Sequence, residues 1–134
     1  MTSPFNIGAN QLPKYIVRYG LMRSLGVMTA RNEDEYRRGN EVIVRSDRGV
    51  EVGQVLCEAT DDALSNLDQP PSGAIVRMVS DEDATNINSI DGDRLHKIEV
   101  CKKQIKALAL NMKLVDVETL LGRERIIVFY VADE

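Results

Sequence analysis

Short apolar runs separated by polar turns fill the first half of the sequence, a pattern that is typical of β-structure. Residues 15–19, 25–29, 42–44 and 50–56 are rich in β-branched, aromatic and other apolar side chains. A fifth apolar run lies at 74–79. Five short strands with glycine-bearing turns predict a small antiparallel sheet that curls into a barrel, because closure removes exposed sheet edges.

The clearest local signal is a hairpin at 39–55, where glycines stand at 39, 49 and 53. Its first apolar run is followed by a turn at 46–49 and by a second β-rich run. Gly49 supplies the positive φ that closes such a loop. Gly53 interrupts the second strand, which indicates a bulge or a close approach of another backbone.

Two segments lack a sustained pattern. Residues 1–13 are polar, with two prolines and a glycine, and are interpreted as a flexible arm. Residues 60–73 combine adjacent prolines with acidic residues, a composition that disfavours both a helix and a central strand, so a loop or linker is expected.

The predicted domain organisation is a flexible arm at 1–13, a small β-barrel-like unit at 14–79 and an α-β-β unit at 80–134. The predicted fold class is α+β.

The sequence switches to a helical period after residue 80. Ser80 offers an N-cap, and Asp83 three residues later completes a pattern that resembles a capping box. A kink or break is expected at Asp91 and Gly92, because glycine in a helix interior costs about 1 kcal/mol relative to alanine. Beyond that point apolar residues recur at spacings of three and four and predict one stripe, formed by Leu95, Ile98, Cys101, Ile105 and Leu108.

Two strands are predicted after the helix, at 113–120 and 125–131. The second, which begins at Arg125 and ends at Val131, is apolar on both faces, as in strands that are covered on both sides. One helix cannot cover both faces, so the second cover comes from the barrel, from another subunit or from a further element. We expect self-association through this sheet, because an exposed apolar face is unfavourable in water.

Composition places the chain among globular proteins with one domain or two small lobes. Its 134 residues are 43% hydrophobic and 28% charged. The longest apolar run, 126–132, is far shorter than the roughly 18 residues of a membrane span, and no secretion signal is visible. We expect a cytoplasmic protein without a transmembrane segment. Cys57 and Cys101 are expected to be free thiols that behave as small buried hydrophobes.

Charge is unevenly distributed along the chain. The net charge of −4 is concentrated in residues 60–96, whereas arginine supplies nearly all the cations before residue 59, with tyrosines interspersed. Arginine and tyrosine suit phosphate contact and base stacking. The candidate nucleic-acid-binding residues are Arg18, Arg23, Arg37, Arg38, Arg45 and Arg48. The alternative interpretation is that they are the solvent-facing residues of alternating strands.

No catalytic motif accompanies these elements. The sequence has no Walker loop, dinucleotide fingerprint, nucleophile elbow or paired CxxC. His96 and Cys101 lie five residues apart, so on a helix they point about 140° apart and do not converge on a metal ion. Asp116 and Glu118 alternate along one strand, but no further group is placed with them for acid–base catalysis. The sequence therefore predicts a protein that is not an enzyme, with no catalytic or metal-binding residue.

Four segments follow one another in a recognisable order: GNEVIVRSDRGVEVGQV at 39–55, a helix with Cys101 and Ile105, NMKLVDVE at 111–118, and RERIIVFYVADE from Arg123. In this order they resemble the polymerase-suppressor (PSP-one) C-terminal region family, whose bacterial members are known as YaaT or RicT proteins. The resemblance covers about residues 14–134. Each motif alone is moderately specific, whereas the four together are not readily explained by coincidence.

The resemblance implies a cytoplasmic, non-enzymatic adaptor or regulatory module. Bacterial proteins of this family act in a complex that modulates RNA processing by a membrane-associated endoribonuclease, and they are linked to sporulation, competence and biofilm control. Protein partners of an RNA-processing complex are therefore expected, with RNA as a further ligand. The alternative function is direct binding of RNA or single-stranded DNA through the arginine-bearing face.

The family pattern also continues past this sequence. In the family, the last strand is followed by an Arg-Val-Asp-Phe-Arg segment, a helix and a cysteine-rich part associated with an iron–sulfur cluster and flavin, and none of these follows Glu134 here. The α-β-β unit is accordingly expected to be incomplete at its C-terminal end. Cys57 and Cys101 do not match the family's ligand motifs, so no cofactor is assigned to this chain.

Overall fold

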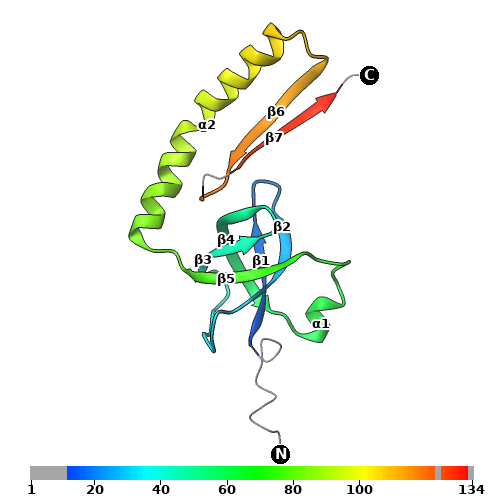
Figure 1. Ribbon diagram of the computed structural model, residues 1–134. Coiled ribbons are helices and arrows are strands. Elements are labelled where there is room, and N and C mark those ends of the chain that lie inside the picture. Colours follow the sequence, from blue (N-terminus) through cyan, green and yellow to red (C-terminus); the bar gives the residue numbers. More distant parts are fainter. Residues whose placement is uncertain (1–11, 123–124, 133–134) are drawn as a thin grey trace, which may run out of the picture. The chain divides into compact units, whose positions relative to one another are not determined.

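Five strands close into a barrel in the computed structural model, which describes residues 12–122 and 125–132 (Figure 1). The strands are β1 (Lys14–Tyr19), β2 (Ser24–Thr29), β3 (Glu41–Ser46), β4 (Gly49–Glu58) and β5 (Ser72–Met78). The predicted barrel of five short strands is therefore confirmed. Most of the expected arm at 1–13 lies outside the described residues.

The strand order in the barrel is β1-β2-β5-β3-β4, with β4 returning to β1. Four of the five pairings are antiparallel, as expected. The fifth is parallel and joins β2 to β5 along Val27–Thr29 and Ser72–Ala74, which the predicted all-antiparallel sheet did not include. Parallel neighbours need a long connection between them. Here the whole β3–β4 hairpin and the segment after it separate the two strands in sequence.

The barrel core is built by side chains that alternate along each strand. On β1, Tyr15, Val17 and Tyr19 point inward, and on β3 Val42 and Val44 do so. Fully burying a side chain of this size contributes about 1.5–3 kcal/mol. Residues from the other strands and the β2–β3 loop complete the cluster, namely Met28, Ala30, Val55 and Ile75.

The predicted hairpin forms, and its glycines have distinct roles. Ser46 pairs with Gly49 across the turn, and Gly49 has a φ of 140°, the positive value that the sequence predicted. A Cβ added at Gly53 would overlap Cγ1 of Val17 and lie 3.2 Å from the carbonyl oxygen of Arg18. Gly53 therefore marks the close approach of β1 to β4. The bulge lies nearby, where the register between these strands shifts at Ile16 and Val17.

The segment predicted to be a loop at 60–73 contains a short helix, α1 (Asp61–Leu64). Thr60 is its N-cap, and the Thr60 hydroxyl accepts a hydrogen bond of 3.1 Å from the backbone N–H of Ala63. The acidic residues that suggested a loop stand in the first turn of this helix, where negative charge is favourable. The prediction of a helix-free segment was therefore wrong.

The chain divides between Val79 and Ser80 into the barrel unit and a second unit, the helix–hairpin unit. The second unit contains α2 (Asp81–Ala107), β6 (Met112–Thr119) and β7 (Ile126–Ala132), in the predicted α-β-β order (Figure 1). The capping box at Ser80 is confirmed, because the Ser80 hydroxyl bonds to the N–H of Asp83 and the Asp83 carboxylate to the N–H of Ser80. β6 and β7 form an antiparallel two-stranded sheet.

Two details of α2 differ from the prediction. The helix runs without a break through Gly92, which is exposed and has no atom within 4 Å of an added Cβ, so the local cost of glycine is tolerated in a helix of 27 residues. The buried face of α2 is also narrower than the predicted stripe. Leu95 and Leu108 are 74% and 64% exposed, because α2 packs mainly along β6 and the half-buried side chains are those of residues such as Ile98 and Ile105.

Gly53→Ala should destabilise the barrel unit by about 1–3 kcal/mol, because its methyl group has no room against the buried side chain of Val17. Gly92→Ala is the matched control: it adds the same methyl group to an exposed helix and should stabilise the helix–hairpin unit by about 0.5–1 kcal/mol. Urea unfolding followed by circular dichroism measures both changes. A Gly53→Ala variant as stable as the wild type would contradict the close approach of β1 and β4.

Candidate functional site

One candidate nucleic-acid-binding residue, Arg48, is engaged inside the barrel unit. Its guanidinium forms an ion pair with the carboxylate of Glu51, with Nε 3.2 Å from Oε2. Glu51 is only 3% exposed and also accepts a hydrogen bond from the hydroxyl of Ser46. The guanidinium carbon lies 5.8 Å from the centre of the Tyr19 ring. Arg48 therefore neutralises a buried carboxylate of the hairpin.

Two other candidate arginines share a pocket of about 320 Å³ at the junction of β1 and β4. Arg18 donates a hydrogen bond of 2.5 Å to the side-chain oxygen of Gln54, which also lines this pocket. Arg23 lies in the β1–β2 turn with a φ of 55°, and Glu41 supplies a negative charge. The pocket therefore combines two guanidinium groups with one carboxylate.

The remaining candidates, Arg37, Arg38 and Arg45, have exposed side chains and do not line that pocket. Arg37 and Arg38 precede the positive-φ turn at Gly39, and Arg45 lies on β3. The structure thus brings Arg18 and Arg23 together, leaves three arginines in solvent and engages Arg48 within the fold.

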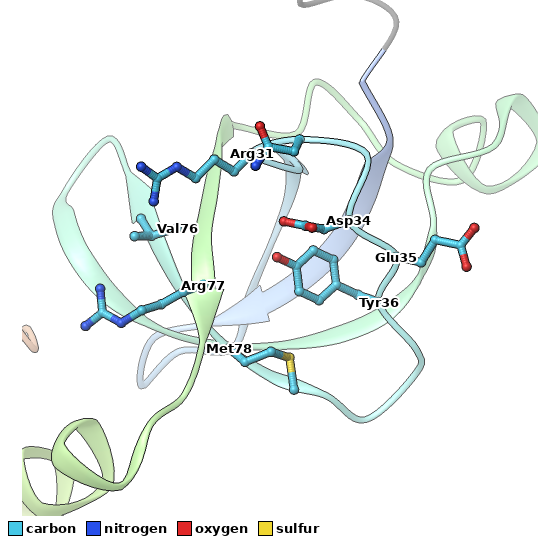
Figure 2. A pocket seen from close by; sticks show the side chains of 8 residues that line it. Arg31, Asp34, Glu35, Tyr36, Val76, Arg77 and Met78 are labelled. Atoms are coloured by element: carbon cyan, nitrogen blue, oxygen red, sulfur yellow. The ribbon is translucent and has the colours of Figure 1, made fainter.

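A larger open pocket, of about 590 Å³, lies between the β2–β3 loop and β5 (Figure 2). Tyr36 forms part of its wall and is held by a 3.1 Å hydrogen bond from its backbone N–H to the hydroxyl of Tyr15, with the two rings edge to face at 5.4 Å. Burial and the nearby charge of Asp34 raise the pKa of Tyr36. The phenol is therefore neutral at physiological pH.

The charges around this pocket are balanced. Figure 2 shows the side chains of Arg31 and Arg77 extending to one side, with Glu35 directed to the opposite side. Asp34 adds a second carboxylate, so two cations face two anions and the pocket has no strong preference for phosphate. This pocket is not apparent from the sequence, because Arg31 and Arg77 come from segments that only the barrel topology brings together.

In the helix–hairpin unit, polar side chains of α2 hold the helix on β6. The guanidinium of Arg94 forms a bidentate ion pair with Asp116, and the ammonium of Lys97 donates a 2.7 Å hydrogen bond to the hydroxyl of Thr119. The hydrogen bond from Arg94 is the main cause that lowers the pKa of Asp116. Asp116, considered above as an acid–base candidate, is thus a structural partner of the helix.

The outer strand β7 carries an exposed apolar surface, which we call the β7 surface. No side chain of β7 is buried, and the strand pairs with β6 alone among the described strands, so its other edge is open. Ile126, Tyr130 and Val131 are each more than half exposed. The β7 surface comprises these three residues together with Val128 and the neighbouring Val115 of β6; Ile126, Val128 and Tyr130 lie on one face of the strand and Val131 on the other.

The described residues contain no group of three His, Cys, Asp or Glu side chains that could hold a metal ion. Both cysteines are free thiols, but Cys57 is exposed, so the prediction that it is buried was wrong. Cys57 follows the part of β4 that lines the core, near the end of the strand. Within the same described part of the chain, no helix has the length and hydrophobicity needed to span a membrane.

Comparison with known families assigns residues 73–134 to the PSP1 C-terminal conserved region. This region begins in β5 and includes the whole helix–hairpin unit. Residues 73–134 therefore carry this family's conserved region, and the chain is similar to YaaT proteins. It is 32% identical over 96 residues to the stage 0 sporulation protein YaaT of Bacillus subtilis (strain 168), an alignment that covers 69% of this chain and 33% of the relative.

The chain thus spans about a third of the length of this relative. No solved structure gives a significant match to the chain. The family assignment confirms the resemblance inferred from the sequence motifs.

Asp116→Asn should reduce the pH dependence of unfolding of the helix–hairpin unit. Because the pKa of Asp116 is lower in the folded chain than its ordinary value of 3.8, the ion pair stabilises the fold above that value. This contribution is lost as the pH falls through the lower, folded pKa. Since Arg94 is 44% exposed, the effect should be at most about 1 kcal/mol.

Urea unfolding between pH 3 and pH 7, about the range over which carboxylates titrate, measures this difference. Glu99→Gln, at an exposed position of the same helix, is the control and should keep the pH dependence of the wild type. An Asp116→Asn variant with unchanged pH dependence would contradict the role assigned to the Arg94 pair.

Proposed function

We propose that this chain is a regulatory, non-catalytic adaptor module of a complex that acts in RNA processing or turnover. The regulatory part is supported by the YaaT relative, whose name places that protein in stage 0 of sporulation. The link to RNA processing rests on the family resemblance. The observation that supports an adaptor is the β7 surface, an apolar strand with an open edge.

Two properties suit the β7 surface to binding a protein. Its open edge offers unpaired backbone N–H and C=O groups, to which a partner strand can add. Its apolar side chains would be removed from water in the complex, and Tyr130 is an aromatic anchor of the kind that contributes strongly to interfaces. Direct binding of RNA or single-stranded DNA is the alternative function. Of the six arginines predicted to bind nucleic acid, Arg18 and Arg23 line one pocket together.

Val128→Glu should abolish the capture of partner proteins by the β7 surface, because a carboxylate would be buried without a partner in the interface. The intact tagged protein is purified from its own cells, and the bound proteins are identified by mass spectrometry. Leu95→Glu is the matched control, since Leu95 is an equally apolar and 74% exposed residue of α2. It should retain the partners, among them subunits of an RNA-processing complex.

Two outcomes would contradict the adaptor function. One is the loss of the same partners in Leu95→Glu and Val128→Glu, which would show that the β7 surface has no particular role. The other is turnover of a substrate by the purified protein.

In the absence of a partner, we propose that the β7 surface of one copy pairs with that of a second copy. Sedimentation velocity should show a monomer–dimer equilibrium that shifts toward the dimer with concentration. Val128→Glu should weaken dimerisation at least about tenfold, because its carboxylate would enter the interface. Leu95→Glu should leave it unchanged. A wild-type chain that stays monomeric at high concentration would overturn this pairing.

A further inference from the structure

A separate pocket of about 320 Å³ lies in the helix–hairpin unit, where the end of α2 meets the start of β6. Its wall contains three lysines, Lys102 and Lys106 from the helix and Lys113 from the strand. Between them the lining is apolar and includes Leu110 and Met112. None of these residues belongs to the β7 surface, so the pocket is a second candidate site. We call it the lysine pocket.

The turn that ends α2 gives the lysine pocket its apolar floor. The N–H of Leu110 donates to the carbonyl oxygen of Ile105 at 3.1 Å, and the N–H of Ala109 donates to that of Lys106 at 3.1 Å. This hydrogen-bond pattern is a Schellman motif, in which the residue after the turn packs back onto the last turn of the helix. Ala109 adopts the left-handed conformation that the motif requires, with a φ of 52°.

The charged residues that line the lysine pocket are all positive. Its lining contains no acidic residue, and its three lysines are exposed and form no ion pair with any residue in the described part of the chain. Lys106, in the last turn of α2, also complements the partial negative charge at the end of that helix. Lys113 lies on β6 and has no such role. Its position brings a third cation to the same apolar floor.

The chemistry of the lining indicates the kind of ligand. Aliphatic side chains and a methionine suit an aliphatic side chain of a partner, and a volume of about 320 Å³ is at the small end for a ligand site. The lining has no aromatic ring on which a base could stack and no arginine to grip a phosphate in two places. Lysine ammonium groups around such a floor complement carboxylates.

We propose that the lysine pocket binds an acidic segment of a partner protein, in which carboxylates flank a leucine-like side chain. The leucine-like side chain enters between Leu110 and Met112, and the carboxylates pair with Lys102, Lys106 and Lys113. This site is independent of the partner that the β7 surface binds. The two sites adjoin, since Lys113 pairs with Val131 across the sheet, but they share no residue, so each is removed by its own substitutions.

The test uses the full chain and a fluorescein-labelled dodecapeptide of repeating Glu-Glu-Leu, with a Gln-Gln-Leu peptide for comparison. Fluorescence anisotropy should show binding of the acidic peptide that weakens with salt, and no comparable binding of the neutral peptide. Lys106→Gln/Lys113→Gln should weaken acidic-peptide binding at least about tenfold. Lys14→Gln/Lys103→Gln removes the same charge from exposed positions outside the pocket and should bind as the wild type does.

A further variant, Leu110→Ala, should also weaken binding of the acidic peptide. Because this substitution leaves the net charge unchanged, it tests the contribution of the apolar lining apart from that of the lysines. Equal weakening by the two double variants would overturn the proposal, because it would show non-specific attraction. Equal affinity of the wild type for the Glu and Gln peptides would also overturn it. So would tighter binding of a uridine dodecanucleotide that is lost in Lys106→Gln/Lys113→Gln, which would identify the pocket as an RNA site.

Discussion

A two-stranded sheet is not stable in water without a cover, and in the helix–hairpin unit one helix provides it. α2 packs along β6, where Leu114 and Val117 are buried, and Leu120, which follows the strand, is buried as well. Asp116 and Thr119 of the same strand hold polar side chains of the helix. β7 lies one strand further out and has no buried side chain. The packing that stabilises β6 therefore also leaves β7 available for binding.

In the barrel unit, charged residues act within the fold as well as on its surface. A buried carboxylate such as Glu51 is costly unless it is paired, and Arg48 provides the pair. Arg18 is bound to Gln54, whereas Arg37 remains exposed. Residues of one type, close together in the sequence, thus differ in whether their charge is available to a ligand. Composition alone cannot separate these cases.

Features that depend on neighbouring residues could be predicted from the sequence. The positive φ of Gly49, the capping box at Ser80 and the α-β-β order are of this kind. Some features that depend on tertiary packing could not. The narrow buried face of α2, which leaves Leu95 and Leu108 exposed, follows from the packing of α2 mainly along one strand. The parallel pairing of β2 with β5 follows from barrel closure.

The same distinction applies to the candidate sites. The uncovered surface of the strand after Arg125 could be predicted, because the apolar residues that form it follow one another in the sequence. The lysine pocket was not predicted. Lys102 and Lys106 lie on the helix, and only the turn at Ala109 brings Lys113 of β6 beside them.

The open edge of β7 has a consequence for the stoichiometry of any complex. A sheet edge has a single row of backbone groups, so it accepts one added strand at a time. A second copy of the chain and a different protein would therefore compete for it. By mass action, self-association would lower the apparent affinity for the other protein as the chain becomes more concentrated. The balance between homodimer and complex would then report the relative abundance of the two partners.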